Sequence, residues 1–62
     1  MTVFVHPSAV CESPSVGPGT QIWAFAHVLK GARIGCDCNV SNGVFIENDV
    51  IVAAADVVGR HL

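Results

Sequence analysis

The sequence is poor in charged and aromatic residues. Only 13% of its 62 residues are charged, it contains no tyrosine, and its formal net charge is −2. Its three cationic residues, Lys30, Arg33 and Arg60, form no basic patch, which argues against a protein that follows a nucleic-acid backbone. We therefore expect no nucleic-acid partner.

Long apolar runs are also missing. No basic stretch followed by a long apolar segment opens the sequence, because His6, Pro7 and Ser8 interrupt it. The sequence thus predicts neither a signal peptide nor a membrane span. We expect a cytoplasmic protein with no membrane partner.

Cysteines are few and odd in number, which argues against a disulfide framework. Cys36 and Cys38 are separated by one residue, a spacing too short for the usual structural zinc clip. We predict free thiols, with Cys38 pointing inward and Cys36 on a corner, and no metal site.

What the sequence does have is a strict period of six. An aliphatic residue or Phe occupies every sixth position without a miss: Phe4, Val10, Val16, Ile22, Val28, Ile34, Val40, Ile46, Val52 and Val58. This period fits neither the 3.6 residues of a helix turn nor the alternation of a free strand. It is typical of hexapeptide-repeat β-helices, in which each short strand forms one side of a coil.

The other positions of the repeat agree with this interpretation. With the aliphatic residue as position one, position five is mostly small, as an inward site in a tight coil requires. Positions three and four hold the turn pairs Pro18-Gly19, Lys30-Gly31, Asn42-Gly43 and Asn48-Asp49, and Gly, Asn and Asp tolerate the positive φ of a sharp corner. We predict an all-β fold of about three coils.

A solenoid this short exposes its two ends, because each repeat contacts only its neighbours. We expect apolar surface at Phe4 and Val58, covered by oligomerisation or by a longer parent chain. A step of one coil predicts three stacks on the outer faces, listed here: Ala9, His27 and Phe45; Gln21 and Asn39; Ser15 and Arg33.

Two residues stand out on the predicted surface. His27 takes an outward position, where it serves either as a surface or subunit-contact histidine or as a base or ligand in a site between subunits. Trp23 and Phe25 break the pattern of small corner residues, and an exposed Trp beside a Phe indicates an interface or a ligand-stacking surface.

The stretch from Val5 to Val52 resembles the opening coils of bacterial sugar-nucleotide 3-N-acetyltransferases, members of the hexapeptide-repeat superfamily. The most specific segments are IWAFAHVLKGARIG, Ile22 to Gly35, and NGVFIENDV, Asn42 to Val50. The resemblance implies a left-handed parallel β-helix, whereas the general crossover rule favours the right hand. It also implies a homotrimer with active sites between neighbouring β-helices.

The function implied by the resemblance is acetyl transfer from acetyl-CoA, a co-substrate, to the 3-amino group of a UDP- or dTDP-linked amino sugar, for synthesis of surface polysaccharide such as O-antigen. Within the most family-like segment, Asn42, Phe45, Glu47 and Asn48 are the candidates for contact with the nucleotide sugar. Corner geometry and outer-face packing explain the same residues equally well. No catalytic residue is transferred, because the residues with that role are expected beyond residue 62.

The pattern changes after Val52. We divide the chain into hexapeptide coils over 1–52 and a divergent tail over 53–62, frameshifted or frayed, in which Asp56 takes an inward position at a cost. We expect a chain too short to be active alone. Alternatives are a non-enzymatic β-helix stub, another hexapeptide O-acetyltransferase, or a zinc-dependent carbonic anhydrase, which would require His6, His27 and His61 to face one cleft.

Overall fold

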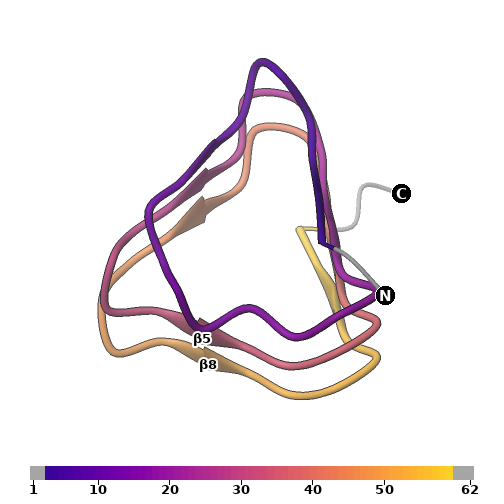
Figure 1. Cartoon of the computed structure of the whole chain (residues 1–62). Helices are drawn as coiled ribbons and strands as arrows, with labels where there is room; N and C mark the ends of the chain where they lie inside the picture. Colours follow the sequence, from indigo (N-terminus) through magenta and orange to yellow (C-terminus); the bar gives the residue numbers. More distant parts are fainter. Residues whose placement is uncertain (1–2, 60–62) are drawn as a thin grey trace.

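The chain winds around a triangular path, with successive coils lying one above the other (Figure 1). This computed structural model describes residues 3–59. All the regular structure in that range is strand, and it contains no helix that could cross a membrane. The strands are β1 (Phe4–Val5), β2 (Val10–Cys11), β3 (Gln21–Ile22), β4 (His27–Val28), β5 (Arg33–Ile34), β6 (Asn39–Val40), β7 (Phe45–Ile46), β8 (Ile51–Val52) and β9 (Val57–Val58).

Three parallel sheets form the three sides of the triangle. The first face contains β1, β3, β6 and β9, the histidine face contains β2, β4 and β7, and the third face contains β5 and β8. Gln21 pairs with Asn39 eighteen residues further along, and Arg33 pairs with Ile51 at the same step. The predicted hexapeptide β-helix is therefore confirmed. The predicted stack of Gln21 on Asn39 is present. Arg33 lies in register with Ser15, as predicted, because the next residues, Val16 and Ile34, form a parallel bridge.

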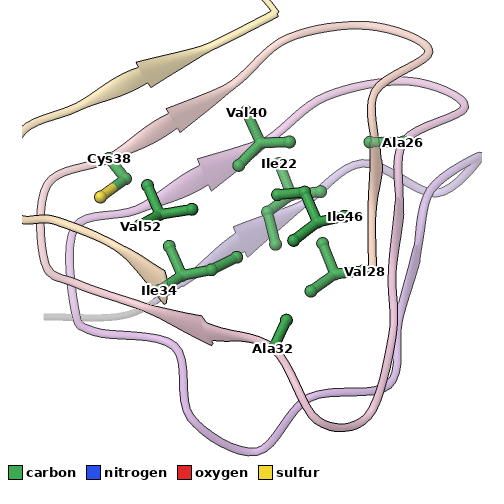
Figure 2. Close-up of a cluster of buried hydrophobic side chains, with 9 residues drawn as sticks. All are labelled: Ile22, Ala26, Val28, Ala32, Ile34, Cys38, Val40, Ile46 and Val52. Carbon is green, nitrogen blue, oxygen red and sulfur yellow. The ribbon is translucent and has the colours of Figure 1, made fainter. Parts of the chain in front are cut away.

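The hydrophobic core runs along the inside of the coils (Figure 2). Its buried members come from positions one and five of the repeat: Ile22, Ala26, Val28, Ala32, Ile34, Cys38, Val40, Ile46 and Val52. Alternation of a large and a small inward residue lets three sides meet at close packing. Cys38 lies inside, Cys36 is exposed and all three cysteines are free, as predicted.

The first coil is shifted by one residue relative to the predicted frame. Val5, and not Phe4, pairs with the buried Ile22, and Cys11, and not Val10, pairs with Val28. Val10 and Phe4 consequently point outward, so the expectation that both belong to the inward series is wrong. Because each is followed by another apolar residue, the sequence supports either frame there.

The shift ends near Ser13, which is buried. Its Oγ donates a hydrogen bond to the carbonyl of Ala32 at 2.6 Å and accepts one from the N–H of Ser15 at 3.0 Å. These bonds satisfy the buried hydroxyl and attach the first coil to the second. From Val16 onward the chain follows the period of six.

Sharp corners separate the three faces. Gly19, Gly43 and Asp49 have positive φ at position four of their repeats, as the turn pairs predict. Gly31, of the pair Lys30-Gly31, does not, so the prediction is wrong at that corner. Phe25 takes the same position with a φ of 62°, a conformation that bulky residues rarely adopt.

The last described coil continues the third and first faces. Asp56 precedes β9 and its backbone carbonyl accepts a hydrogen bond from the N–H of Asn39. Its side chain is exposed, so the expectation of a buried, costly carboxylate is wrong: no coil among the described residues covers it. Arg60 and His61 lie outside the described residues.

Candidate functional site

The histidine face carries a column of exposed side chains. Val10, His27 and Phe45 lie in register on β2, β4 and β7, so Val10 takes the place that the sequence predicted for Ala9. Phe45 is 57% exposed, and its ring meets that of His27 edge-on, with centroids 5.6 Å apart. An outward-facing His27 is confirmed.

Glu12 orients the histidine. Its Oε2 lies 3.1 Å from Nε2 of His27, and both side chains are partly open to solvent. A carboxylate on one ring nitrogen favours the tautomer that carries its proton there, which leaves Nδ1 as the acceptor when the ring is neutral. Sequence inspection missed Glu12, because the partnership depends on the shifted register of the first coil.

Trp23 lies at the corner between the first face and the histidine face. Its Nε1 donates a hydrogen bond to Oδ1 of Asn39 at 2.7 Å, and its ring packs on Phe4 with centroids 5.2 Å apart. The expectation of an exposed tryptophan is therefore wrong: it is half-buried. A shallow hollow beside it is lined by Trp23, Ser41, Asn42 and Gly59.

Glu47 and Asn48 lie at the opposite corner, between the histidine face and the third face. Oδ1 of Asn48 accepts a hydrogen bond from the N–H of Gly31 at 2.7 Å, which joins two coils at this corner. The side chain of Glu47 is exposed. The predicted sugar contacts thus flank one face, with Phe45 between Asn42 at one corner and Asn48 at the other.

Phe25 adds an exposed aromatic ring at the Asn42 corner, where the N–H of Gly43 donates to the carbonyl of Ala24. Its side chain is 74% exposed despite the unfavourable backbone conformation. An exposed Phe in a strained position contributes little to the stability of this coil, so its role is better sought in contact with another molecule.

Metal ligands do not gather on this surface. Within residues 3–59 no three His, Cys, Asp or Glu side chains are placed to hold a metal ion together. His6 follows β1 on the first face, whereas His27 belongs to β4 on the histidine face. The described histidines therefore do not face one cleft.

Comparison with known proteins identifies the repeat. Residues 13–48 match the family model described as bacterial transferase hexapeptide (six repeats). The chain is 51% identical over 39 residues to a dTDP-3-amino-3,6-dideoxy-alpha-D-galactopyranose 3-N-acetyltransferase of Aneurinibacillus thermoaerophilus, covering 63% of this chain and 20% of that protein. No solved structure matches the chain.

A second kind of relative covers more of the chain at lower identity. Acyl-(acyl-carrier-protein)–UDP-N-acetylglucosamine O-acyltransferases of Brucella ovis and Brucella canis are each 36% identical over 59 residues, which is 94% of this chain and 21% of theirs. The chain therefore spans about a fifth of the length of the curated relatives that it matches.

Proposed function

The chain belongs to the bacterial transferase hexapeptide family, and we propose that it supplies β-helix coils of an acetyl-CoA-dependent N-acetyltransferase. The acceptor in this proposal is the 3-amino group of a UDP- or dTDP-linked amino sugar, and the product serves surface-polysaccharide synthesis in the cytoplasm. One observation carries the proposal: the 51% identity to a 3-N-acetyltransferase of a dTDP-linked amino sugar.

Acetyl transfer to an amine depends more on the positioning of the two substrates than on a strong base. The lone pair of the amine attacks the thioester carbonyl carbon, a C–N bond forms, the C–S bond breaks, and the thiolate leaves and takes the proton that the nitrogen loses. Holding two bound substrates in line accounts for much of the acceleration of such a step. Hydrogen-bond donors aimed at the carbonyl oxygen stabilise the charge that develops there.

The histidine face supplies groups suited to the acceptor. In the proposal, Phe45 packs against the apolar face of the sugar ring, while Asn42, Glu47 and Asn48 hydrogen-bond to its hydroxyl and amino groups. A pairing of one aromatic ring with several polar side chains is common in sites that orient a polar ligand. The Glu47 carboxylate can also accept a hydrogen bond from an N–H of the neutral amine, which an amino sugar has and an ordinary sugar lacks.

A homotrimer completes this proposal. Val10, Phe25 and Phe45 expose large apolar side chains on and beside the histidine face. Contact with a neighbouring β-helix would remove that surface from water. It would also enclose the site between two subunits, with Trp23 and His27 at the contact.

Transfer to a hydroxyl group is the second candidate, favoured by the contact between Glu12 and His27. A hydroxyl must lose its proton as it attacks, so a histidine held by a carboxylate is useful there, as a general base. The similarity to O-acyltransferases over 94% of the chain supports the same alternative.

Acetyl transfer by a chimera tests the proposal. Residues 3–59 replace the coils of the Aneurinibacillus enzyme that contain the 39-residue match to this chain, and transfer from acetyl-CoA to its dTDP-linked 3-amino sugar is measured. We expect amide formation, with Phe45→Ala reducing kcat/KM by about tenfold or more, since several kcal/mol of positioning depends on such contacts. A folded chimera that forms no amide would contradict the proposal.

His27→Ala separates the two candidates. Loss of a general base costs about 10²–10⁴-fold when a hydroxyl is acetylated. We expect a loss below about tenfold for the amine, whose lone pair is already available. A hundredfold loss of amide formation would favour the hydroxyl chemistry and its base.

A further inference from the structure

The third face carries a hollow that the proposed sugar contacts leave unused. It is lined by Ser15, Lys30, Gly31, Ala32, Arg33, Asp49 and Ile51. Two of the chain's three cationic residues, Lys30 and Arg33, line it together. Among the described residues these are the only two cations besides the histidines, so the positive charge of this region is concentrated at one place.

Neither cation is neutralised within the described part of the chain. The one carboxylate contact of salt-bridge length formed there joins Glu12 to His27 on another face. Asp49 lines the same hollow, but no oxygen of it lies within salt-bridge distance of Lys30 or Arg33. Guanidinium and ammonium groups that lack a carboxylate partner favour phosphate, to which Arg donates two parallel hydrogen bonds.

On the third face, this hollow adjoins an apolar groove. A second depression shares Ser15, Arg33 and Ile51 with the first and continues past Gly17, Gly35 and Ala53. Small residues occur there because neighbouring coils approach closely: a Cβ on Gly35 would lie 2.8 Å from the backbone nitrogen of Ala54. Ile51 is 75% exposed between the two depressions and offers an apolar contact.

The hollow also adjoins the proposed sugar contacts. Lys30 and Gly31 form the corner between the histidine face and the third face, and Asn48 is hydrogen-bonded to Gly31 at that corner. A ligand whose sugar lies near Phe45 and Asn48 would cross this corner to place an attached phosphate beside Lys30. The two surfaces therefore meet at this corner.

We propose that the hollow of Ser15, Lys30 and Arg33 binds the phosphoryl group of a substrate. This inference rests on the proposed function, in which both substrates carry phosphate: the nucleotide sugar as a diphosphate and the acyl donor on its CoA portion. Lys30 and Arg33 hold the phosphate oxygens, the Ser15 hydroxyl donates a further hydrogen bond, and the groove beyond Arg33 receives the less polar continuation of the ligand. Asp49 opposes binding and limits its strength.

Titration of the 62-residue chain followed by NMR tests the site. The probes are dTDP, thymidine, CoA and dephospho-CoA, and the readout is the shift of backbone amide signals. We expect dTDP, and not thymidine, to shift Ser15 and the residues from Lys30 to Arg33, with weaker binding at higher ionic strength because exposed charges are screened. Shifts caused by CoA and not by dTDP would instead assign the hollow to the acyl donor, and their loss with dephospho-CoA, which keeps the diphosphate, would assign it to the 3′-phosphate of CoA.

Variants that remove a positive or a negative charge from the hollow should change the Kd in opposite directions. Lys30→Gln and Arg33→Gln should each raise the Kd by about five- to tenfold, as loss of one charge-assisted hydrogen bond predicts. Arg33→Lys keeps the charge but loses the paired hydrogen bonds, so its Kd should lie between that of the unchanged chain and that of Arg33→Gln. Asp49→Asn should lower the Kd about threefold, whereas Asp56→Asn, which removes the same charge away from the hollow, should leave it unchanged.

Two results would overturn the site. One is a Kd that does not respond to Lys30→Gln or Arg33→Gln. The other is phosphate-dependent shifts confined to the hollow beside Trp23 and Asn42, or absent altogether. Either result leaves the proposed function standing if the chimera still forms the amide, so the two failures are distinguishable.

Discussion

Gly17 shows how closely the coils stack. A Cβ at this position would lie 2.5 Å from the backbone nitrogen of Cys36 and 2.6 Å from the carbonyl carbon of Gly35 in the next coil. Carbon atoms in favourable contact are about 3.5–4.0 Å apart. To accommodate the methyl group of Gly17→Ala, the two coils must therefore move apart by about 1 Å. The obstructing atoms belong to the backbone and cannot rotate away as a side chain would.

The cost follows from this geometry. Overpacking of a closely packed site costs about 1–3 kcal/mol, and the N–H of Gly17 donates to the carbonyl of Ile34 at 2.8 Å, a bond worth about 1 kcal/mol that the shift would weaken. We expect Gly17→Ala to lower the free energy of unfolding by about 2–4 kcal/mol. The total free energy of unfolding of a chain of this size is roughly 3–9 kcal/mol. The Tm of Gly17→Ala should therefore fall by about 10 °C or more.

Gly43→Ala is the matched control. Nothing lies within 4 Å of a Cβ built there, although its φ of 72° makes alanine unfavourable. Left-handed backbone strain alone costs about 1 kcal/mol. Both variants are compared by far-UV circular dichroism during thermal and urea unfolding. If Gly17→Ala loses no more stability than Gly43→Ala, the coils are not packed as closely as described.

Three further predictions concern single side chains. Thr20 is fully buried, and its hydroxyl donates to the carbonyl of Gly35 at 2.7 Å and accepts from the N–H of Cys38 at 3.2 Å. Thr20→Val leaves both backbone groups unpaired and should lower the free energy of unfolding, measured in urea, by about 2–3 kcal/mol. A loss under about 0.5 kcal/mol would contradict this. Phe25→Asn relieves an unfavourable φ and should raise the free energy of unfolding by about 1 kcal/mol. It should also weaken self-association, measured by sedimentation. A destabilised monomer would argue that Phe25 packs on its own coil. Glu12→Gln removes the carboxylate from a partly exposed contact with His27. This substitution should change the free energy of unfolding by less than about 1 kcal/mol. A larger loss in the same assay would mean that the contact is shielded from solvent.

The repeat could be predicted from the sequence because one inward residue in six is a strong constraint. Ile22, Val28 and Val40 are all inside, as the period requires, and the turn pairs Asn42-Gly43 and Asn48-Asp49 lie at corners. The hand of the helix came from the family resemblance. Periodicity carries no information on handedness.

The frame of the first coil could not be predicted from the same pattern. Phe4-Val5 and Val10-Cys11 are pairs of apolar neighbours, so a shift of one residue keeps an apolar residue inside. The contact between Glu12 and His27 depends on that shift. It therefore became visible only when the coils were placed in register.

The candidate site was predicted in part. Phe45 and His27 were expected on one outer face, and they lie there in ring contact. The clustering of Lys30 and Arg33 was missed, because two cations three residues apart look unremarkable in a chain without a basic patch. A corner and a shallow hollow bring them together on the third face.

Competition between two acceptors tests the account most directly. The chimera that carries residues 3–59 receives acetyl-CoA with an equimolar mixture of a dTDP-linked 3-amino sugar and its 3-hydroxy counterpart, and the two products are separated by mass. We predict that the amide predominates over the ester by at least about a hundredfold, the factor that a hydroxyl acceptor loses without an effective general base. A folded chimera that yields mainly ester, or neither product, would contradict the assignment to amino-sugar N-acetylation.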